Sequence, residues 1–124
     1  MATIETSIDI DRQLTIHTVT GEVLSDEIAH KIKSYNESGP TKFILWDFSK
    51  AILNKITSSQ IKAFVTLTMQ YANLRKGGKT ALVFSSDLGF GLGRVYDSHQ
   101  ELAESEIPHM TFRSKELALN WLLK

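Results

Sequence analysis

Two short, uninterrupted apolar runs constrain the fold of this chain more than any other feature. Phe43 to Trp46 and Ala81 to Phe84 each contain four consecutive apolar residues. A strand with one covered face alternates apolar and polar residues, so continuous runs indicate strands that are covered on both faces. Helices on both sides of a mainly parallel sheet provide such cover, which predicts an α/β fold.

The segments around these runs supply the other strands and helices. Apolar and polar residues alternate over residues 4–10 and again over 14–21, which predicts an antiparallel hairpin, and residues 109–112 are typical of a short last strand. Four segments have the apolar spacing of helices; they are residues 25–38 (with Ser25 as N-cap), 58–76, 94–105 and 115–122. The predicted order is therefore β-β-α-β-α-β-α-β-α, a single five-stranded mixed sheet that is mainly parallel with an antiparallel N-terminal hairpin.

Two longer connections are expected at one edge of this sheet. Residues 49–56 are predicted to be a loop, and Asp87 to Gly93 a glycine-rich turn. Open α/β sheets keep their sites at the carboxyl ends of parallel strands, where both connections would emerge.

Composition bounds the domain count and the partner class. The 124 residues, 42% of them hydrophobic, predict one globular domain spanning residues 1–124. Fourteen basic and fourteen acidic residues cancel, so the chain lacks the positive charge that a nucleic-acid partner would favour. The absence of cysteine excludes disulfides and thiol catalysis. No apolar run approaches a membrane span and no leader pattern opens the chain, so we expect a cytoplasmic domain.

Two motifs, together with the order of elements, carry a resemblance to a known family. Trp46-Asp47-Phe48-Ser49 closes the first apolar run, and Phe90, Gly91, Arg94, Tyr96 and Asp97 form a spaced pattern after the second. Over nearly its whole length the chain resembles the SpoIIAA-like branch of the STAS fold, which comprises small bacterial proteins similar to sulfate-transporter and anti-sigma-antagonist domains. The resemblance implies regulation through protein binding. The lipid-binding Sec14 fold is sometimes grouped with this branch, which implies a ligand as the alternative.

Ser58 is the candidate phosphorylation site that this resemblance implies. Thr57-Ser58-Ser59-Gln60 falls at about the position where the antagonists carry Asp-Ser-Ser-Gly, whose first serine is phosphorylated by a partner kinase. A helix N-terminus favours phosphate through its free amides and dipole. The chain departs from the pattern at Thr57 and Gln60, and these two residues also satisfy a capping box, so a capped helix without phosphorylation is the alternative.

The glycine-rich segment suggests a ligand site. Its glycines do not have the dinucleotide-binding spacing, but glycine amides at a helix start, followed by Arg94, could accept an anion. The alternative is a tight packing turn with Phe90 as its plug. His99 lies on the predicted apolar face beside Tyr96, either as a core residue or as a pocket residue. The candidate ligand-binding residues are Asp47, Gly89, Phe90, Gly91, Gly93, Arg94, Tyr96 and His99.

A second apolar stripe on the predicted 58–76 helix suggests self-association. Leu67, Tyr71 and Leu74 widen the apolar face beyond the usual third of a helix, which favours a homodimer interface. The sequence contains no nucleophile elbow, no phosphate loop and no cluster with metal-ligand spacing, so we expect no catalytic residues, no metal and no cofactor. The leading hypothesis is a non-enzymatic cytoplasmic module that binds a protein partner. The alternative is a carrier or sensor of a small apolar or anionic ligand near Gly89 to Arg94.

Overall fold

The computed structural model describes residues 2–124, and its five strands form one mixed sheet in the order β1-β2-β3-β4-β5. The first two strands pair antiparallel and all later neighbours pair parallel. This confirms the predicted sheet and the predicted order of elements. The strands are β1 (Thr3–Asp9), β2 (Leu14–Glu22), β3 (Phe43–Ile52), β4 (Lys79–Val83) and β5 (His109–Phe112).

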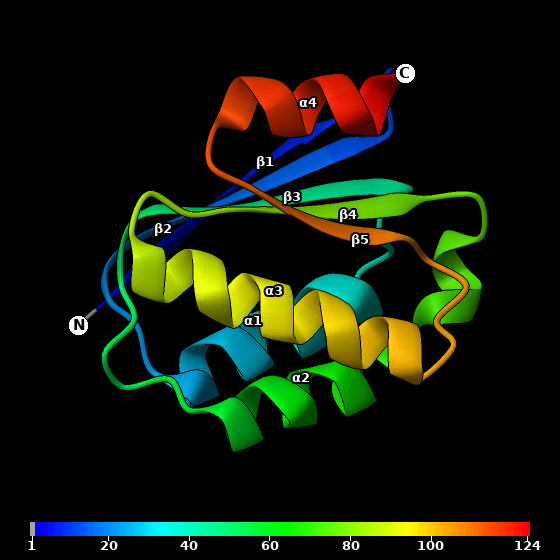
Figure 1. The fold of residues 1–124 in the computed structure, drawn as a ribbon. Coiled ribbons are helices and arrows are strands. Elements are labelled where there is room, and N and C mark those ends of the chain that lie inside the picture. Colours follow the sequence, from blue (N-terminus) through cyan, green and yellow to red (C-terminus); the bar gives the residue numbers. More distant parts are fainter. Residues whose placement is uncertain (1) are drawn as a thin grey trace.

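The helices are divided unequally between the two faces of the sheet. Figure 1 shows α1, α2 and α3 together on one face and α4 alone on the other. No helix within residues 2–124 is long and apolar enough to cross a membrane. The helices are α1 (Ser25–Glu37), α2 (Ser58–Met69), α3 (Asp87–Leu102) and α4 (Lys115–Leu123), with a 3-10 turn η1 (Ala72–Arg75) after α2.

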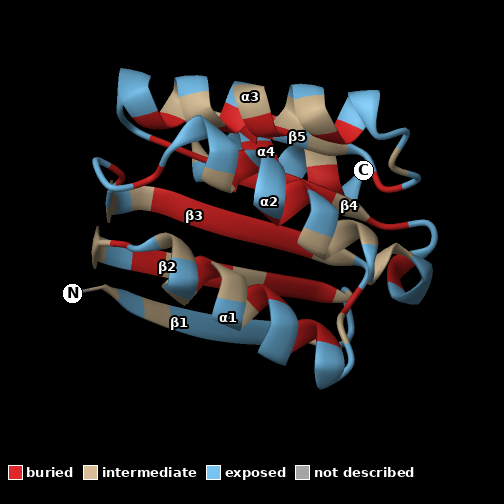
Figure 2. Cartoon of the chain, turned by 90° about the horizontal axis from the view of Figure 1, so that it is seen from below, coloured by how far each residue is buried: buried red, intermediate tan, exposed pale blue. Residues whose placement is uncertain are grey.

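Each face of the sheet has its own hydrophobic core, and β3 contributes to both. Ile44, Trp46 and Phe48 belong to the large core under α1–α3, whereas Leu45 belongs to the smaller core under α4. The uninterrupted apolar run therefore lies in a strand covered on both faces, as predicted. Figure 2 shows β3 buried in its first half, over residues 44–48, and the edge strand β1 largely exposed. Ile8 of β1 is accordingly more than half exposed despite the alternating pattern.

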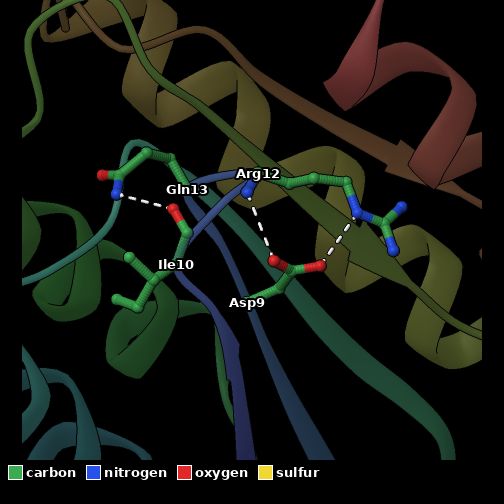
Figure 3. A network of polar contacts seen from close by, with 4 residues as sticks. All are labelled: Asp9, Ile10, Arg12 and Gln13. Carbon is green, nitrogen blue, oxygen red and sulfur yellow. Dashed lines mark hydrogen bonds and ion pairs between the residues drawn. The ribbon is translucent and has the colours of Figure 1, made fainter.

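A short polar network closes the hairpin between β1 and β2 (Figure 3). The Asp9 carboxylate accepts hydrogen bonds from the backbone N–H of Arg12 at 3.2 Å and from its Nε at 2.8 Å. Gln13 donates from its side-chain amide to the Ile10 carbonyl at 3.1 Å. Gln13 has φ of +52°, the left-handed conformation that turns the chain back into β2.

Three predicted boundaries were wrong. The predicted loop over residues 49–56 is shorter, because β3 continues to Ile52 by pairing with the end of β2. The predicted helix over residues 58–76 ends at Met69 and is followed by the separate turn η1. Ser25 is the first residue of α1 rather than its N-cap, which is Leu24.

The predicted glycine-rich turn was also wrong, because Asp87 to Gly93 is the first half of α3. The N-cap is Ser86, whose Oγ accepts a hydrogen bond from the Gly89 N–H at 3.0 Å. Gly89 and Gly93 lie one turn apart and face the sheet. A Cβ at Gly93 would lie 2.5 Å from Cε2 of Phe84. The glycines therefore allow the helix to approach the sheet closely instead of turning the chain.

Candidate functional site

The carboxyl ends of strands β2, β3 and β4 form an edge with exposed apolar side chains. Figure 1 shows the amino ends of α1, α2 and α3 together at this edge, at the left of the view. Leu24, Ile52 and Leu88 lie here and are 48%, 49% and 54% exposed. The Val23 N–H donates to the Ile52 carbonyl at 3.2 Å, so the first two come from adjacent chain segments. We name these three exposed residues the carboxyl-edge patch; contiguous exposed apolar surfaces mark contact sites.

Ser58 is exposed in the first turn of α2, at the same edge. The helix start is capped as the sequence predicted: Thr57 Oγ1 accepts from the Gln60 N–H at 3.3 Å, and Gln60 Oε1 accepts from the Thr57 N–H at 2.9 Å. The capping box is thus confirmed. Phosphorylation of Ser58 stays a prediction.

Two of the amides on which the predicted anion site was argued are already paired. Because α3 begins at Asp87, the Gly89 N–H donates to Ser86 Oγ and the Phe90 N–H donates to the Ser86 carbonyl at 2.9 Å. Neither amide remains free for a ligand. The Phe90 ring instead packs under the Arg113 guanidinium, whose central carbon lies 4.3 Å from the ring centroid. Arg113 also pairs with Asp87 at 2.9 Å.

The sheet separates Asp47 from the candidate residues on α3. Side chains alternate along a strand, so Asp47 points toward α4 because its neighbours Trp46 and Phe48 point toward α1–α3. Asp47 is buried and its Oδ1 accepts from the Ser49 N–H at 3.0 Å. Tyr96 lies in the core on the other side. The structure therefore does not assemble Asp47 and Tyr96 into one site.

The face of α3 that packs inward differs from the predicted one. Its buried residues are Gly89, Gly93, Tyr96 and Gln100, whereas His99 is only half-buried. The predicted stripe was rotated because two of the inward positions are glycines, which carry no hydrophobic signal. Gly91 and Arg94 are exposed.

A cavity of about 80 Å³ lies between the sheet and helices α1–α3. Its walls are mostly apolar and include Ile44, Phe64 and Leu82. Of the predicted ligand-binding residues, Gly93 and Tyr96 line it, and the other six lie outside its lining among the described residues. Trp46 lines it as well.

Comparisons with known proteins identify the fold. No protein-family model matches the sequence, and no curated protein matches it. Among solved structures, an anti-sigma factor antagonist from Mycobacterium paratuberculosis is 15% identical, with TM-score 0.65 over 100% of this chain and 96% of that one. An uncharacterised Shewanella loihica protein with a SpoIIAA-like fold is 15% identical, with TM-score 0.58 over 98% and 93%. The phosphorylated form of the Bacillus cell fate determinant SpoIIAA is 18% identical, with TM-score 0.56 over 96% and 98%.

The chain has the SpoIIAA-like fold. At these identities the likeness shows the fold, which confirms the architecture that the sequence motifs implied. Most side chains on this fold differ from those of the solved structures. Several buried polar side chains were not expected from the sequence.

Arg75 is a buried arginine without an acidic partner among residues 2–124. It lies in η1, and arginine is rarely buried in folded proteins unless it is paired. Four hydrogen bonds hold its guanidinium, all to neutral oxygens: Nε donates to the Thr41 carbonyl at 3.2 Å, Nη1 to Thr80 Oγ1 at 2.8 Å, and Nη2 to the Lys42 and Lys79 carbonyls at 2.8 Å each. Burial lowers the Arg75 pKa to about 10, so it is still charged at neutral pH.

Two histidines of this SpoIIAA-like domain are held uncharged near Arg75. Burial, with smaller contributions from the charges of Lys31 and Arg75, lowers the pKa of His17 to about 3, and burial together with the Arg75 charge lowers the pKa of His109 to about 4. His17 is fully buried in β2, with Nδ1 2.9 Å from Thr6 Oγ1. The sequence contains no sign of this burial, because the alternation over residues 14–21 favours Leu14 and Ile16 as the inward set. The structure buries the other set, which contains Thr15 and His17, more deeply.

Proposed function

We propose that this SpoIIAA-like domain is a cytoplasmic, non-enzymatic module that binds a protein partner through the carboxyl-edge patch. The observation that carries the proposal is the exposure of Leu24, Ile52 and Leu88 at one edge of the sheet. Each side chain is about half exposed, so a partner that covers all three gains on the order of 1 kcal/mol from each. A few residues near the centre of an interface carry most of its binding energy, which makes substitution of these three a direct test.

The solved structures with this fold support a protein partner over a reaction. Two of them are anti-sigma factor antagonists by name, which describes proteins that act on another protein. The carboxyl edge of this chain offers apolar groups and a capped helix start, which suit a contact surface.

A pair of matched double variants tests the proposal. Ile52→Asp with Leu88→Asp places charge in the patch, whereas Leu102→Asp with Leu117→Asp places the same charge on exposed apolar positions elsewhere. Each tagged protein is expressed in its own host, and retained proteins are quantified by mass spectrometry after circular dichroism has shown native folding. We expect at least one protein that the wild type and the control retain and the patch variant loses. Equal retention by all three would overturn the proposal.

We further propose that phosphorylation of Ser58 regulates this contact. Ser58 is exposed at the same edge, and one solved structure with this fold is a phosphorylated form. A phosphate there would add charge beside the apolar patch. Ser58→Glu should weaken partner binding about tenfold, which corresponds to about 1.4 kcal/mol. Ser59→Glu, one residue further along the same exposed turn, is the matched control. If both substitutions change affinity equally, the effect is one of general charge and the site assignment fails.

A further inference from the structure

We propose that the cavity under the sheet binds a small, uncharged molecule that carries N–H or O–H donors. The site is the polar end of the cavity, which we define by Asn36, Arg75, Gln100 and His109. These residues come from the end of α1, from η1, from the end of α3 and from the start of β5. They therefore lie at the amino edge of the parallel strands, opposite the carboxyl-edge patch, and the proposal is independent of protein binding.

Gln100 supplies the first unpartnered acceptor. Only 2% of the residue is exposed, and its Nε2 donates to Thr68 Oγ1 at 2.8 Å and to Tyr96 Oη at 2.9 Å. The Thr68 hydroxyl gives its own hydrogen to the Val65 carbonyl at 3.0 Å, so it can only accept from Gln100. This fixes the orientation of the amide. Oε1 of Gln100 is left buried, with no hydrogen-bond partner among residues 2–124.

Asn36 supplies the second. It is 7% exposed, and its Nδ2 donates to the Ile32 carbonyl at 2.7 Å. A carbonyl cannot donate, so the amide orientation is again fixed, and Oδ1 is the unpartnered atom within the described chain. Buried acceptors are nearly always paired in folded proteins, so two such oxygens around one cavity indicate an occupant that donates.

His17 and His109 also line the cavity, and neither ring carries a charge at neutral pH. His109 Nδ1 lies 2.7 Å from the Ile107 carbonyl, to which it must donate, so His109 Nε2 carries a lone pair. His17 lines the cavity, and its Nε2 has no hydrogen-bond partner in the described part of the chain. Both rings are uncharged at neutral pH because burial lowers their pKa values.

Charge decides the class of ligand. A cation is repelled by the buried Arg75 guanidinium. The Arg75 charge would attract an anion, but the anion would face the oxygens of Asn36 and Gln100, and four of the five N–H groups of Arg75 already donate to protein oxygens. A neutral donor satisfies the acceptors without either penalty. The apolar walls then favour a ligand whose remaining surface is hydrocarbon.

The volume limits the size of the ligand. At about 80 Å³ the cavity has roughly half the volume of the ~150 Å³ engineered cavity that binds benzene. A small five-membered ring is therefore the upper limit of size for the ligand, and two to three water molecules at ~30 Å³ each would fill the same volume. Tyr71, Ser105 and His109 line the cavity and are half-buried, so this end lies close to solvent.

Pyrrole and furan are the matched probes for this proposal. The two rings have nearly the same size, but pyrrole has an N–H donor and furan has none. Each is titrated into the ¹⁵N-labelled protein while the side-chain amide signals of Asn36 and Gln100 are followed by NMR. We expect pyrrole to shift both signals with a dissociation constant on the order of 1 mM. Furan should bind at least about tenfold more weakly, because it has no N–H to donate to either oxygen, whereas the single N–H of pyrrole can pair with one of them.

A pair of variants tests whether pyrrole binding depends on the Gln100 acceptor or only on the volume of the cavity. Gln100→Met keeps the length of the side chain and removes the acceptor, so pyrrole binding should weaken about tenfold. Gln70→Met, at an exposed position after α2, is the control and should bind pyrrole like the wild type. If Gln100→Met fails to fold, the comparison of the two probes on the wild-type protein still decides.

Equal binding of pyrrole and furan would show an apolar cavity without donor selection. Water contacts at Asn36 and Gln100 without any pyrrole shift would show ordered water only. Either result overturns the proposal.

Discussion

Two glycines in the same helix should respond in opposite directions to alanine. Gly91 and Gly93 both lie in the first half of α3, two residues apart. Gly91 faces outward and Gly93 faces the sheet. The same substitution at the two positions therefore compares open space with a close helix–sheet contact, in a segment whose glycines suggest a turn.

Gly91→Ala should stabilise the fold. A Cβ at this position would meet no heavy atom of the described residues within 4 Å, so the added methyl group causes no clash. Glycine inside a helix is about 1 kcal/mol less favourable than alanine. The free energy of unfolding should therefore rise by about 1 kcal/mol.

Gly93→Ala should destabilise it. The new Cβ would lie 2.5 Å from Cε2 of Phe84 and 2.7 Å from Cγ2 of Thr111. Both residues are buried, and the Phe84 ring is stacked on Phe48 with 5.1 Å between centroids, so neither can move freely. Overpacking of this kind lowers stability by about 1–3 kcal/mol, and here we expect the upper end. After the helix-propensity gain of about 1 kcal/mol, the net loss is about 2 kcal/mol, which puts the two variants about 3 kcal/mol apart.

Urea unfolding followed by far-ultraviolet circular dichroism measures this difference. The slope of the free energy against urea should be unchanged, while the midpoint moves up for Gly91→Ala and down for Gly93→Ala. If Gly91→Ala were destabilising, residue 91 would need a conformation that only glycine adopts readily, as in a turn. If Gly93→Ala were neutral, α3 would not pack against Phe84 and Thr111. Either result would refute the assignment of this segment.

Three further predictions concern single residues. Thr57→Ala should lower the free energy of unfolding by about 1 kcal/mol in urea titrations, because it removes the cap of α2; an unchanged value would contradict the cap. Burial raises the Asp97 pKa from 3.8 to about 6, so the folded chain holds this proton more tightly than the unfolded chain and stability falls as pH rises from about 4 to 6. Asp97→Asn should abolish that fall and be about 1–2 kcal/mol more stable at pH 7, allowing for partial exposure, with no gain at pH 3. Self-association through Leu67, Tyr71 and Leu74 stays a prediction. The first two are half-buried, so Leu74→Asp is the informative change, and unaltered sedimentation would exclude this interface.

The sheet could be predicted because its signals are local. An uninterrupted apolar run such as Phe43 to Trp46 has one economical explanation, a strand covered on both faces, and the structure has it in β3. The capping box from Thr57 to Gln60 is equally local, because both hydrogen bonds span three residues. Neither prediction needed knowledge of which distant segments meet.

The glycine segment could not be assigned from sequence, because glycine serves two opposite purposes. It permits a turn through positive φ, and it permits a helix to approach a sheet closely through the missing Cβ. The two uses are distinguished by the residues that residue 93 meets, which are Phe84, directly after β4, and Thr111, in β5. The sequence alone does not show that these strands lie against residue 93. The predicted turn was wrong, and with it the assumption that the Gly89 and Phe90 amides are free, because the helix start uses them.

The buried polar residues were missed for a related reason. Hydrophobic patterns treat polar residues as outward-facing, so Arg75 and Gln100 carried no inward signal. Arg75 is buried because its guanidinium meets carbonyls more than thirty residues earlier in the chain, at Thr41 and Lys42. Contacts of that range follow only from the assembled fold.

The two ends of the parallel strands therefore have different chemistry, and this makes the two proposals separable. The carboxyl edge carries the proposed patch of Leu24, Ile52 and Leu88, whereas the amino edge encloses Arg75 and the unpartnered oxygens of Asn36 and Gln100. Arg75 links the amino ends of β3 and β4 through hydrogen bonds to the Lys42 and Lys79 carbonyls. A substitution at the carboxyl edge should not disturb these hydrogen bonds. Ile52→Asp should accordingly leave pyrrole binding unchanged, and Gln100→Met should leave partner retention unchanged. Loss of both properties in either variant would show that the edges are coupled, and the division of the domain into two independent sites would be wrong.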